Sequence, residues 1–225
     1  MNKVFQKLIP QYHNFILIGG PGAGKSELGI NLALFLAQTE TNVHFFDLDQ
    51  TKPLFRSRNM AEVMERAGIH VHAQEQFQDI PSMVPGIIES LGDKSRFTFL
   101  DVGGGVHGAL MAGQLSQAIN TSDTFVFYAI NVYRPWSSTS KGISKTCDEI
   151  MDACHALNIH IVGNPTLGPT TTADEVIRGD QLLDTLLSGK AETEYLCVDQ
   201  RLLPLVEQHV NKTIIPIQPY ICMTP

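Results

Sequence analysis

The sequence predicts an α/β fold in which a mostly parallel, doubly wound sheet lies between two layers of helices, in a single domain spanning residues 1–225. Three observations predict it. Short apolar runs alternate with longer helical segments along the chain, which is typical of parallel strands joined by right-handed crossovers. Several runs are apolar nearly throughout, as in strands covered on both faces. With 225 residues, 43% of them hydrophobic and 17% charged, the chain can bury one substantial core.

Each predicted strand is a short apolar run that ends in polar or turn-forming residues. In chain order the runs occupy 14–18, 43–47, 69–73, 97–101, 124–130, 159–164 and 195–199. The amphipathic or apolar segments between and after them are predicted helices, at 27–38, 60–67, 81–91, 108–120, 138–157, 172–187 and 200–210. Thr172 and Glu175 have the spacing of a capping box at the start of one of these helices.

Composition excludes several classes of function. The formal net charge of −7, from 16 Lys plus Arg and 23 Asp plus Glu, argues against a nucleic-acid surface, because phosphate backbones need clustered cations. No signal peptide or membrane-spanning run is present, and the prolines of "IIPIQPYICMTP" exclude an amphipathic membrane anchor. The cysteines lack the close spacing of a zinc ribbon or redox pair, so a reducing cytoplasm is expected; they are Cys147, Cys154, Cys197 and Cys222.

One glycine-rich stretch carries the strongest chemical signal. The segment "GGPGAGKS", residues 19–26, matches GxxxxGK[ST] and lies between an apolar strand and a helix. Because glycines have no side chain, the backbone N–H groups of the loop can turn toward phosphates, and the helix N-terminus adds partial positive charge. Lys25 then reaches the β- and γ-phosphates, and the Ser26 hydroxyl binds Mg²⁺. The predicted nucleotide-binding residues here are Gly20, Pro21, Gly22, Ala23, Gly24, Lys25, Ser26 and Glu27.

A second strand supplies a carboxylate for the same site. The run "RFTFLDVGGG" ends in Asp101, which is expected to support Mg²⁺, and Gly104 follows three positions later. The amide of Gly104 can sense a γ-phosphate and move when it leaves. The spacing DxxG is typical of nucleotide switches and favours a switch ATPase or GTPase. The alternative is that Asp101 is a helix cap after an ordinary strand.

Two more carboxylates, Asp47 and Asp49, stand at the end of the second predicted strand. If Asp47 ends the strand, both side chains point toward the phosphate edge, where one orients the attacking water or binds magnesium. Their spacing does not assign the two roles, and an ordinary polar turn is the alternative. Arg56 and Arg58 follow in the same loop and can contact phosphates or an anionic partner.

Taken together, "GGPGAGKS", "DLD" and "DVGG" resemble the MinD/ParA/CobQ group of P-loop ATPases, over about residues 15–217. The longer strings "DLDQTKPLFRSR", "LDVGGG" and "GNPTLGPTT" resemble a poorly characterised branch of that group. The resemblance implies ATP or ADP with Mg²⁺ as cofactors. It also implies that Asn164, at the end of the sixth predicted strand, contacts adenine, although a turn asparagine before Pro165 explains the same residue.

One position departs from the group. Many members carry a signature lysine just before the paired glycines, and that lysine reaches the partner's phosphates across a dimer. Ile18 stands at that position here. An ATP-dependent homodimer would then need another cation, and Arg56, Arg58 and Arg134 are the candidates.

Other features have structural explanations. Cys147 and Cys154 share one apolar helix stripe with Ile143, Ile150 and Leu157, so they are expected in the core. His70 and His72 share one face of a strand without evident further metal ligands. In "VYRPW", Trp136 is the only tryptophan and marks either a partner surface or packing.

These observations predict a cytoplasmic P-loop ATPase that hydrolyses MgATP slowly and acts on an unidentified client protein, with no nucleic-acid or membrane partner. In this reading Lys25, Asp47, Asp49 and Asp101 are the catalytic residues, and Ser26, Asp47 and Asp101 are the metal ligands. One alternative is an ATP-dependent small-molecule ligase or kinase similar to dethiobiotin synthetase, with Lys52, Arg56 or Arg58 holding an acidic substrate. The other is an ATP-dependent scaffold or partitioning protein without significant hydrolysis.

Overall fold

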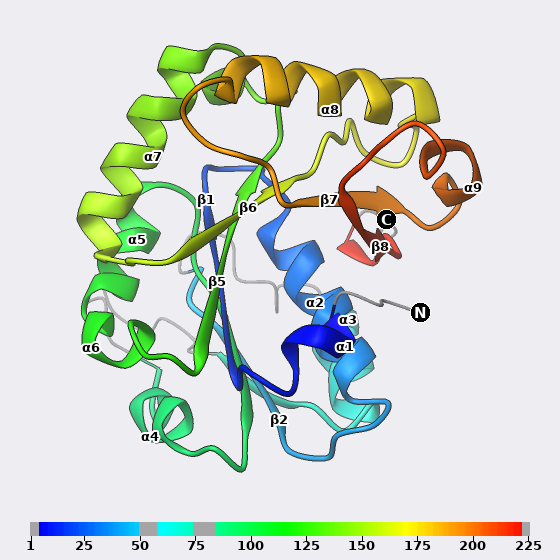
Figure 1. The fold of residues 1–225 in the computed structure, drawn as a ribbon. Helices are drawn as coiled ribbons and strands as arrows, with labels where there is room; N and C mark the ends of the chain where they lie inside the picture. The colour runs from blue at the N-terminus through cyan, green and yellow to red at the C-terminus, as the bar shows by residue number, and fades with distance from the viewer. Residues whose placement is uncertain (1–4, 50–57, 74–83, 222–225) are drawn as a thin grey trace.

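The computed structural model, which describes residues 5–49, 58–73 and 84–221, is built around one eight-stranded sheet. Every neighbouring pair of strands is parallel, and the order is β3-β2-β4-β1-β5-β6-β7-β8 (Figure 1). The strands are β1 (Asn14–Gly19), β2 (Val43–Asp47), β3 (His70–Ala73), β4 (Phe97–Asp101), β5 (Thr124–Ile130), β6 (Ile159–Gly163), β7 (Tyr195–Asp199) and β8 (Thr213–Ile217).

Helices cover both faces of this sheet. Alternate residues of β1 show the division, because Phe15 and Leu17 lie in one buried cluster while Ile16 and Ile18 lie in the other. The first cluster includes residues of α1 (Phe5–Leu8), α2 (Lys25–Leu36) and α3 (Arg58–Arg66). The second includes residues of α4 (Ile87–Gly92), α5 (Val106–Gly113), α6 (Ser116–Ile119), α7 (Ser140–Cys154) and α8 (Ala173–Leu187). The predicted three-layer α/β fold is therefore confirmed.

The strand predictions follow the structure closely because the central strands are buried on both faces. All residues of β1 and β5 are buried, as their continuous apolar character predicts. The strand β8 was not predicted. It lies at the sheet edge beside β7, where Pro216, paired with Val198, is tolerated because an edge strand has one unpaired side.

Some helices differ from the prediction. The predicted helix 108–120 is two helices, α5 and α6, and 200–210 contains only the short α9 (Leu203–Val206). Cys154 is fully buried and Cys147 packs against the core, as expected, but Leu157 is 75% exposed. It falls outside the stripe because α7 ends at Cys154, with His155 in the left-handed conformation. The capping box of Thr172 and Glu175 is confirmed.

The order of the strands fixes the location of a site. The chain leaves β1 through α2 to β2 on one side, and then crosses from β4 to β5 on the other side of β1. In sheets of this kind ligands bind beyond the carboxyl ends of the strands where the connections diverge. The loops after β1, β4 and β5 meet there. Within the described ranges, no helix is long and apolar enough to cross a membrane.

Candidate functional site

The glycine-rich loop connects the end of β1 to the start of α2. Gly22 and Gly24 have φ of 70° and 89°, a left-handed conformation that side chains disfavour. Lys25 is the first residue of α2, and no side chain caps this helix. Its first backbone N–H groups therefore remain available to a ligand, which makes the loop an anion site on geometric grounds.

Lys25 lies beneath this loop and is only 7% exposed. Its ammonium donates to the Gly20 carbonyl oxygen at 3.4 Å. Burial lowers the pKa of Lys25, while the negative charges of Asp101 and Asp49 oppose that shift. An ammonium held in this setting gains strongly from a polyanion brought close to it.

Asp101 ends β4, in register with Leu17 of β1, and is 1% exposed. Neither of its carboxylate oxygens has a hydrogen-bond partner in the described part of the chain. Burial raises the pKa of Asp101 to about 6, against the opposing charge of Lys25 and the nearby Ser26 hydroxyl. A buried carboxylate without a partner beside a serine hydroxyl fits a hard cation such as Mg²⁺, which prefers oxygen ligands.

Asp47 and Asp49 take different positions. The Asp47 carboxylate is buried at the end of β2 and accepts the backbone N–H of Asp49 at 2.8 Å. Asp49, in contrast, is one of the residues that line the cavity described below, and Asp47 is not. The two carboxylates thus differ in position, while the catalytic and metal-binding roles expected of them stay predictions.

The loop after β4 packs directly on the glycine-rich loop. The Gly105 N–H donates to the Gly19 carbonyl at 3.3 Å. A Cβ at Gly104 would lie 2.9 Å from the Pro21 Cα, so only glycine allows this approach. The two loops are therefore in direct contact at Gly104 and Gly105.

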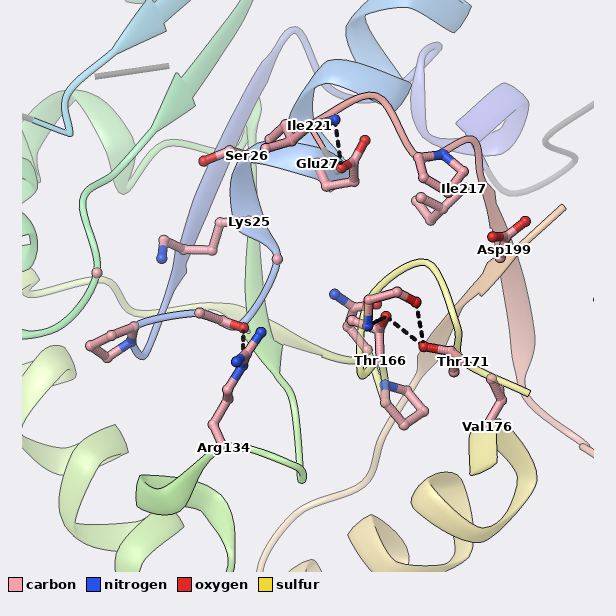
Figure 2. A pocket seen from close by; sticks show the side chains of 18 of the residues that line it. Lys25, Ser26, Glu27, Arg134, Thr166, Thr171, Val176, Asp199, Ile217 and Ile221 are labelled. Carbon is pink, nitrogen blue, oxygen red and sulfur yellow. Dashed lines mark hydrogen bonds between the residues drawn. The ribbon is translucent and has the colours of Figure 1, made fainter. Parts of the chain in front are cut away.

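Two side chains after β5 hold the outer turn of the glycine-rich loop. The Trp136 indole N–H donates to the Pro21 carbonyl at 2.9 Å, and the Arg134 Nε–H donates to the Gly22 carbonyl at 3.0 Å. Figure 2 shows Arg134 reaching the loop from below. Sequence reasoning missed this pair of contacts; the only available signal was the single tryptophan, beside an arginine, just after a strand.

Asn164 follows β6 and also holds the loop. Its side-chain amide donates to the Ala23 carbonyl at 2.9 Å. The donor is thus occupied by the protein itself in this structure. The contact of Asn164 with adenine stays a prediction.

Glu27 lines the cavity described below, and Ile18 lies in the buried strand β1. The Glu27 carboxylate accepts backbone N–H groups of Tyr220 and Ile221, at 2.6 and 3.1 Å, so it faces the C-terminal segment. Ile18 is 1% exposed in the core of the sheet. Its side chain belongs to the buried cluster that includes residues of α5 and α7. Lys52 and Arg56 lie outside the described residues, and Arg58 is the first residue of α3.

A cavity of about 650 Å³ is lined by residues of the glycine-rich loop, of the loops after β4, β5 and β6, and of the segment after β8. Its size is typical of a pocket for a small molecule or cofactor. One end is formed by Pro21, Gly22, Gly24, Lys25, Ser26, Asp49, Gly104 and Arg134. The rest is lined by Glu27, Asn164, Pro165, Thr166, Gly168, Thr171, Val176, Asp199, Leu202, Ile217, Pro219 and Ile221 (Figure 2). Of the predicted nucleotide-binding residues, only Gly20 and Ala23 are absent from this lining.

No protein-family model and no curated protein matches this chain. Solved structures of FtsY, described as a signal recognition particle receptor in one organism and as a cell division protein in another, resemble it. The Thermotoga maritima protein is 11% identical with a TM-score of 0.55, and the match covers 98% of this chain and 76% of that one. The Elizabethkingia anophelis receptor in complex with GDP is 14% identical, with a TM-score of 0.54 and coverage of 88% and 65%. The chloroplast receptor of Physcomitrella patens is 12% identical, with a TM-score of 0.55 and coverage of 93% and 62%.

This chain thus spans less than two thirds of the length of the Elizabethkingia and Physcomitrella receptors. At these identities the similarities show the fold alone. It is an α/β fold of the P-loop NTPase type, with an all-parallel sheet flanked by helices. The narrower resemblance to the MinD/ParA/CobQ group stays a prediction.

Proposed function

We propose that this protein binds MgATP in the cavity above β1 and hydrolyses it slowly as a conformational switch. One observation carries the proposal. The cavity begins at the uncapped N-terminus of α2, where the ammonium of Lys25 is buried near an Asp101 carboxylate that has no hydrogen-bond partner among the described residues. Buried charged groups that lack hydrogen-bond partners are expected at a site where a charged ligand supplies the missing interactions.

The triphosphate occupies the end of the cavity formed by the glycine-rich loop. Backbone N–H groups of the loop and of the first turn of α2 donate to the phosphate oxygens. Lys25 places its ammonium against the same group, so its position neutralises charge that builds up during phosphoryl transfer. Arg134 and Trp136 hold the outer carbonyls of the loop, and the loop therefore needs little reorganisation to bind.

Ser26 and Asp101 are the residues that would hold Mg²⁺, and the cation would neutralise phosphate charge when bound. Asp49 lines the same end of the cavity and is the carboxylate placed to orient the attacking water. Asp47 positions Asp49 by accepting its backbone N–H.

Loss of the γ-phosphate would reach the surface through the loop after β4. Gly104 lies against Pro21, and α5 begins two residues later at Val106. Val106 and Leu110 of α5 are 38% and 51% exposed. These two apolar side chains lie on the helix that follows Gly104, the residue proposed to sense the γ-phosphate. We expect a client protein, or a second copy of this chain, to dock on them in one nucleotide state.

Calorimetric titration of ATP with and without Mg²⁺, together with phosphate release, tests this proposal. We expect binding that requires Lys25, so Lys25→Ala abolishes it while Lys145→Ala, at an exposed position of α7, leaves it intact. Undiminished binding by Lys25→Ala would refute the site.

Two further measurements sharpen the result. Competition between ATP and GTP decides the base, because one of the similar receptor structures holds GDP. The rate of phosphate release distinguishes the alternatives. Slow release by the protein alone supports the switch, whereas tight binding with no release favours either the small-molecule ligase or kinase or the scaffold without significant hydrolysis.

A further inference from the structure

The segment 217–221, which ends β8 and continues beyond it, forms one wall of the cavity. Ile217, Pro219 and Ile221 line the cavity on this side. Figure 2 shows Ile221 beside Glu27. Ile217 and Ile221 both lie across the cavity from Thr166 and Thr171. We call residues 217–221 the C-terminal wall.

Glu27 and Asn31 attach this wall to the helix that begins at the glycine-rich loop. The Glu27 carboxylate accepts the N–H groups of Tyr220 and Ile221, at 2.6 and 3.1 Å. Asn31 pairs with the backbone of Gln218 in both directions, because its Nδ2 donates to the carbonyl at 2.9 Å and its Oδ1 accepts the N–H at 2.8 Å. Glu27 and Asn31 are four residues apart in α2, so they lie on the same face of the helix.

These contacts are stronger than ordinary surface hydrogen bonds. A carboxylate that accepts two backbone N–H groups makes charge-assisted bonds, which are shorter and stronger than neutral ones. Burial raises the pKa of Glu27, and the hydrogen bonds from Tyr220 and Ile221 oppose that shift. Asn31 pairs with Gln218 just beyond the end of β8, where Ile217 is the last residue in register with β7, so the wall has a defined position past the strand.

The lining of the cavity changes character along its length. The end at the glycine-rich loop carries Lys25, Ser26, Asp49 and Arg134, which suit phosphate and metal. The other end presents Val176, Leu202, Ile217 and Pro219. A flat aromatic base gains most from packing against an apolar surface of this kind, whereas phosphates gain nothing from it.

We propose that Glu27 and Asn31 are positioning residues for the nucleotide base, because they hold the C-terminal wall in the place against which the base packs. The inference rests on the proposed function, since it takes the phosphates to lie at the glycine-rich loop. Glu27 directly follows Ser26 in the chain but acts on the base through the wall and not on the phosphates.

This role predicts a loss that depends on the base. Removing the attachment should weaken ligands that have a base and spare a polyphosphate that lacks one. The probes are therefore ATP and inorganic tripolyphosphate, each titrated calorimetrically in the presence of Mg²⁺. The variants are Glu27→Gln and Asn31→Ala, with Glu192→Gln as the matched control, because Glu192 is exposed in the loop before β7 and remote from the wall.

We expect Glu27→Gln and Asn31→Ala each to raise the Kd for ATP at least tenfold and to change the Kd for tripolyphosphate less than twofold. Lys25→Ala should weaken both ligands, and Glu192→Gln neither. Thermal unfolding confirms that each variant is folded, and Asn31→Ala tests the wall independently if Glu27→Gln does not fold.

Each other outcome overturns a defined claim. An equal loss of ATP and tripolyphosphate affinity would place Glu27 at the phosphates and refute the inference. Unchanged ATP affinity in both variants would show that the wall does not position the base. A wild-type protein that binds neither ligand would overturn the proposed function itself, and the inference with it.

Discussion

Replacing Gly24 with alanine should destabilise the protein through two separable effects. Gly24 has φ of 89°, and an L-residue in the left-handed conformation costs about 1–2 kcal/mol. Its new methyl group would also overlap the Asn164 side-chain amide. That amide can rotate away only by giving up its hydrogen bond to the Ala23 carbonyl, a loss of about 0.5–1.5 kcal/mol. The expected total is about 1.5–3.5 kcal/mol.

Urea unfolding of four proteins separates the two contributions: wild type, Gly24→Ala, Asn164→Ala and the double variant. In the Asn164→Ala background the methyl group meets no amide, so Gly24→Ala should cost only about 1–2 kcal/mol there. Gly68→Ala is the matched control, because Gly68 has φ of 85° and no atom lies within 4 Å of the added Cβ. It should show the backbone cost alone.

The result that would refute this reasoning is additivity. If Gly24→Ala costs the same with and without Asn164, within about 0.5 kcal/mol, the amide does not hold the loop as the structure shows. Equal costs at Gly24 and Gly68 would give the same conclusion. Equal urea m-values across the series are needed for the comparison, since a changed m-value signals a changed denatured state.

Three other predictions follow from the same geometry. Gly104→Ala should weaken MgATP in calorimetry while leaving the secondary structure intact, because its Cβ would lie 2.9 Å from the Pro21 Cα; unchanged affinity would contradict the packing of the two loops. The fluorescence of Trp136, the only tryptophan, should change when MgATP is added; unchanged fluorescence would argue against its contact with the glycine-rich loop. Trp136→Phe should lower the free energy of unfolding by about 1 kcal/mol through loss of the hydrogen bond to the Pro21 carbonyl. Burial and the neighbouring histidines lower the pKa of His44 to about 4, so its neutral form is favoured in the fold. The free energy of unfolding should therefore fall by about 1–2 kcal/mol as the pH drops from about 6.5 toward 4. In thermal unfolding, His44→Asn should reduce this dependence of stability on pH.

Much of the sheet could be predicted because burial on both faces leaves a continuous apolar run. The bounds of β2, β4, β5 and β7 equal the predicted ones for that reason. The break between α5 and α6 could not be predicted, because it depends on tertiary packing. A Cβ at Gly113 would overlap the Ala153 carbonyl of α7, so the chain passes closely there and turns.

The candidate site also contains a part that the sequence could predict and a part that it could not. The glycine-rich loop, Lys25 and Ser26 are local in sequence, so their spacing was sufficient to place them. The choice between Asp47 and Asp49 depends on side-chain direction, which spacing does not contain. The hydrogen bonds of Glu27 could not be predicted from spacing, because its partners, Tyr220 and Ile221, lie 193 and 194 residues away.

That separation has a consequence for synthesis and folding. The glycine-rich loop is synthesised nearly two hundred residues before the C-terminal wall. Closing such a long loop carries an entropic cost that only the assembled sheet can offset. Under the proposed function, a nascent chain forms its phosphate site long before it can bind a whole nucleotide, and tight binding of the nucleotide then requires that β8 has joined the sheet.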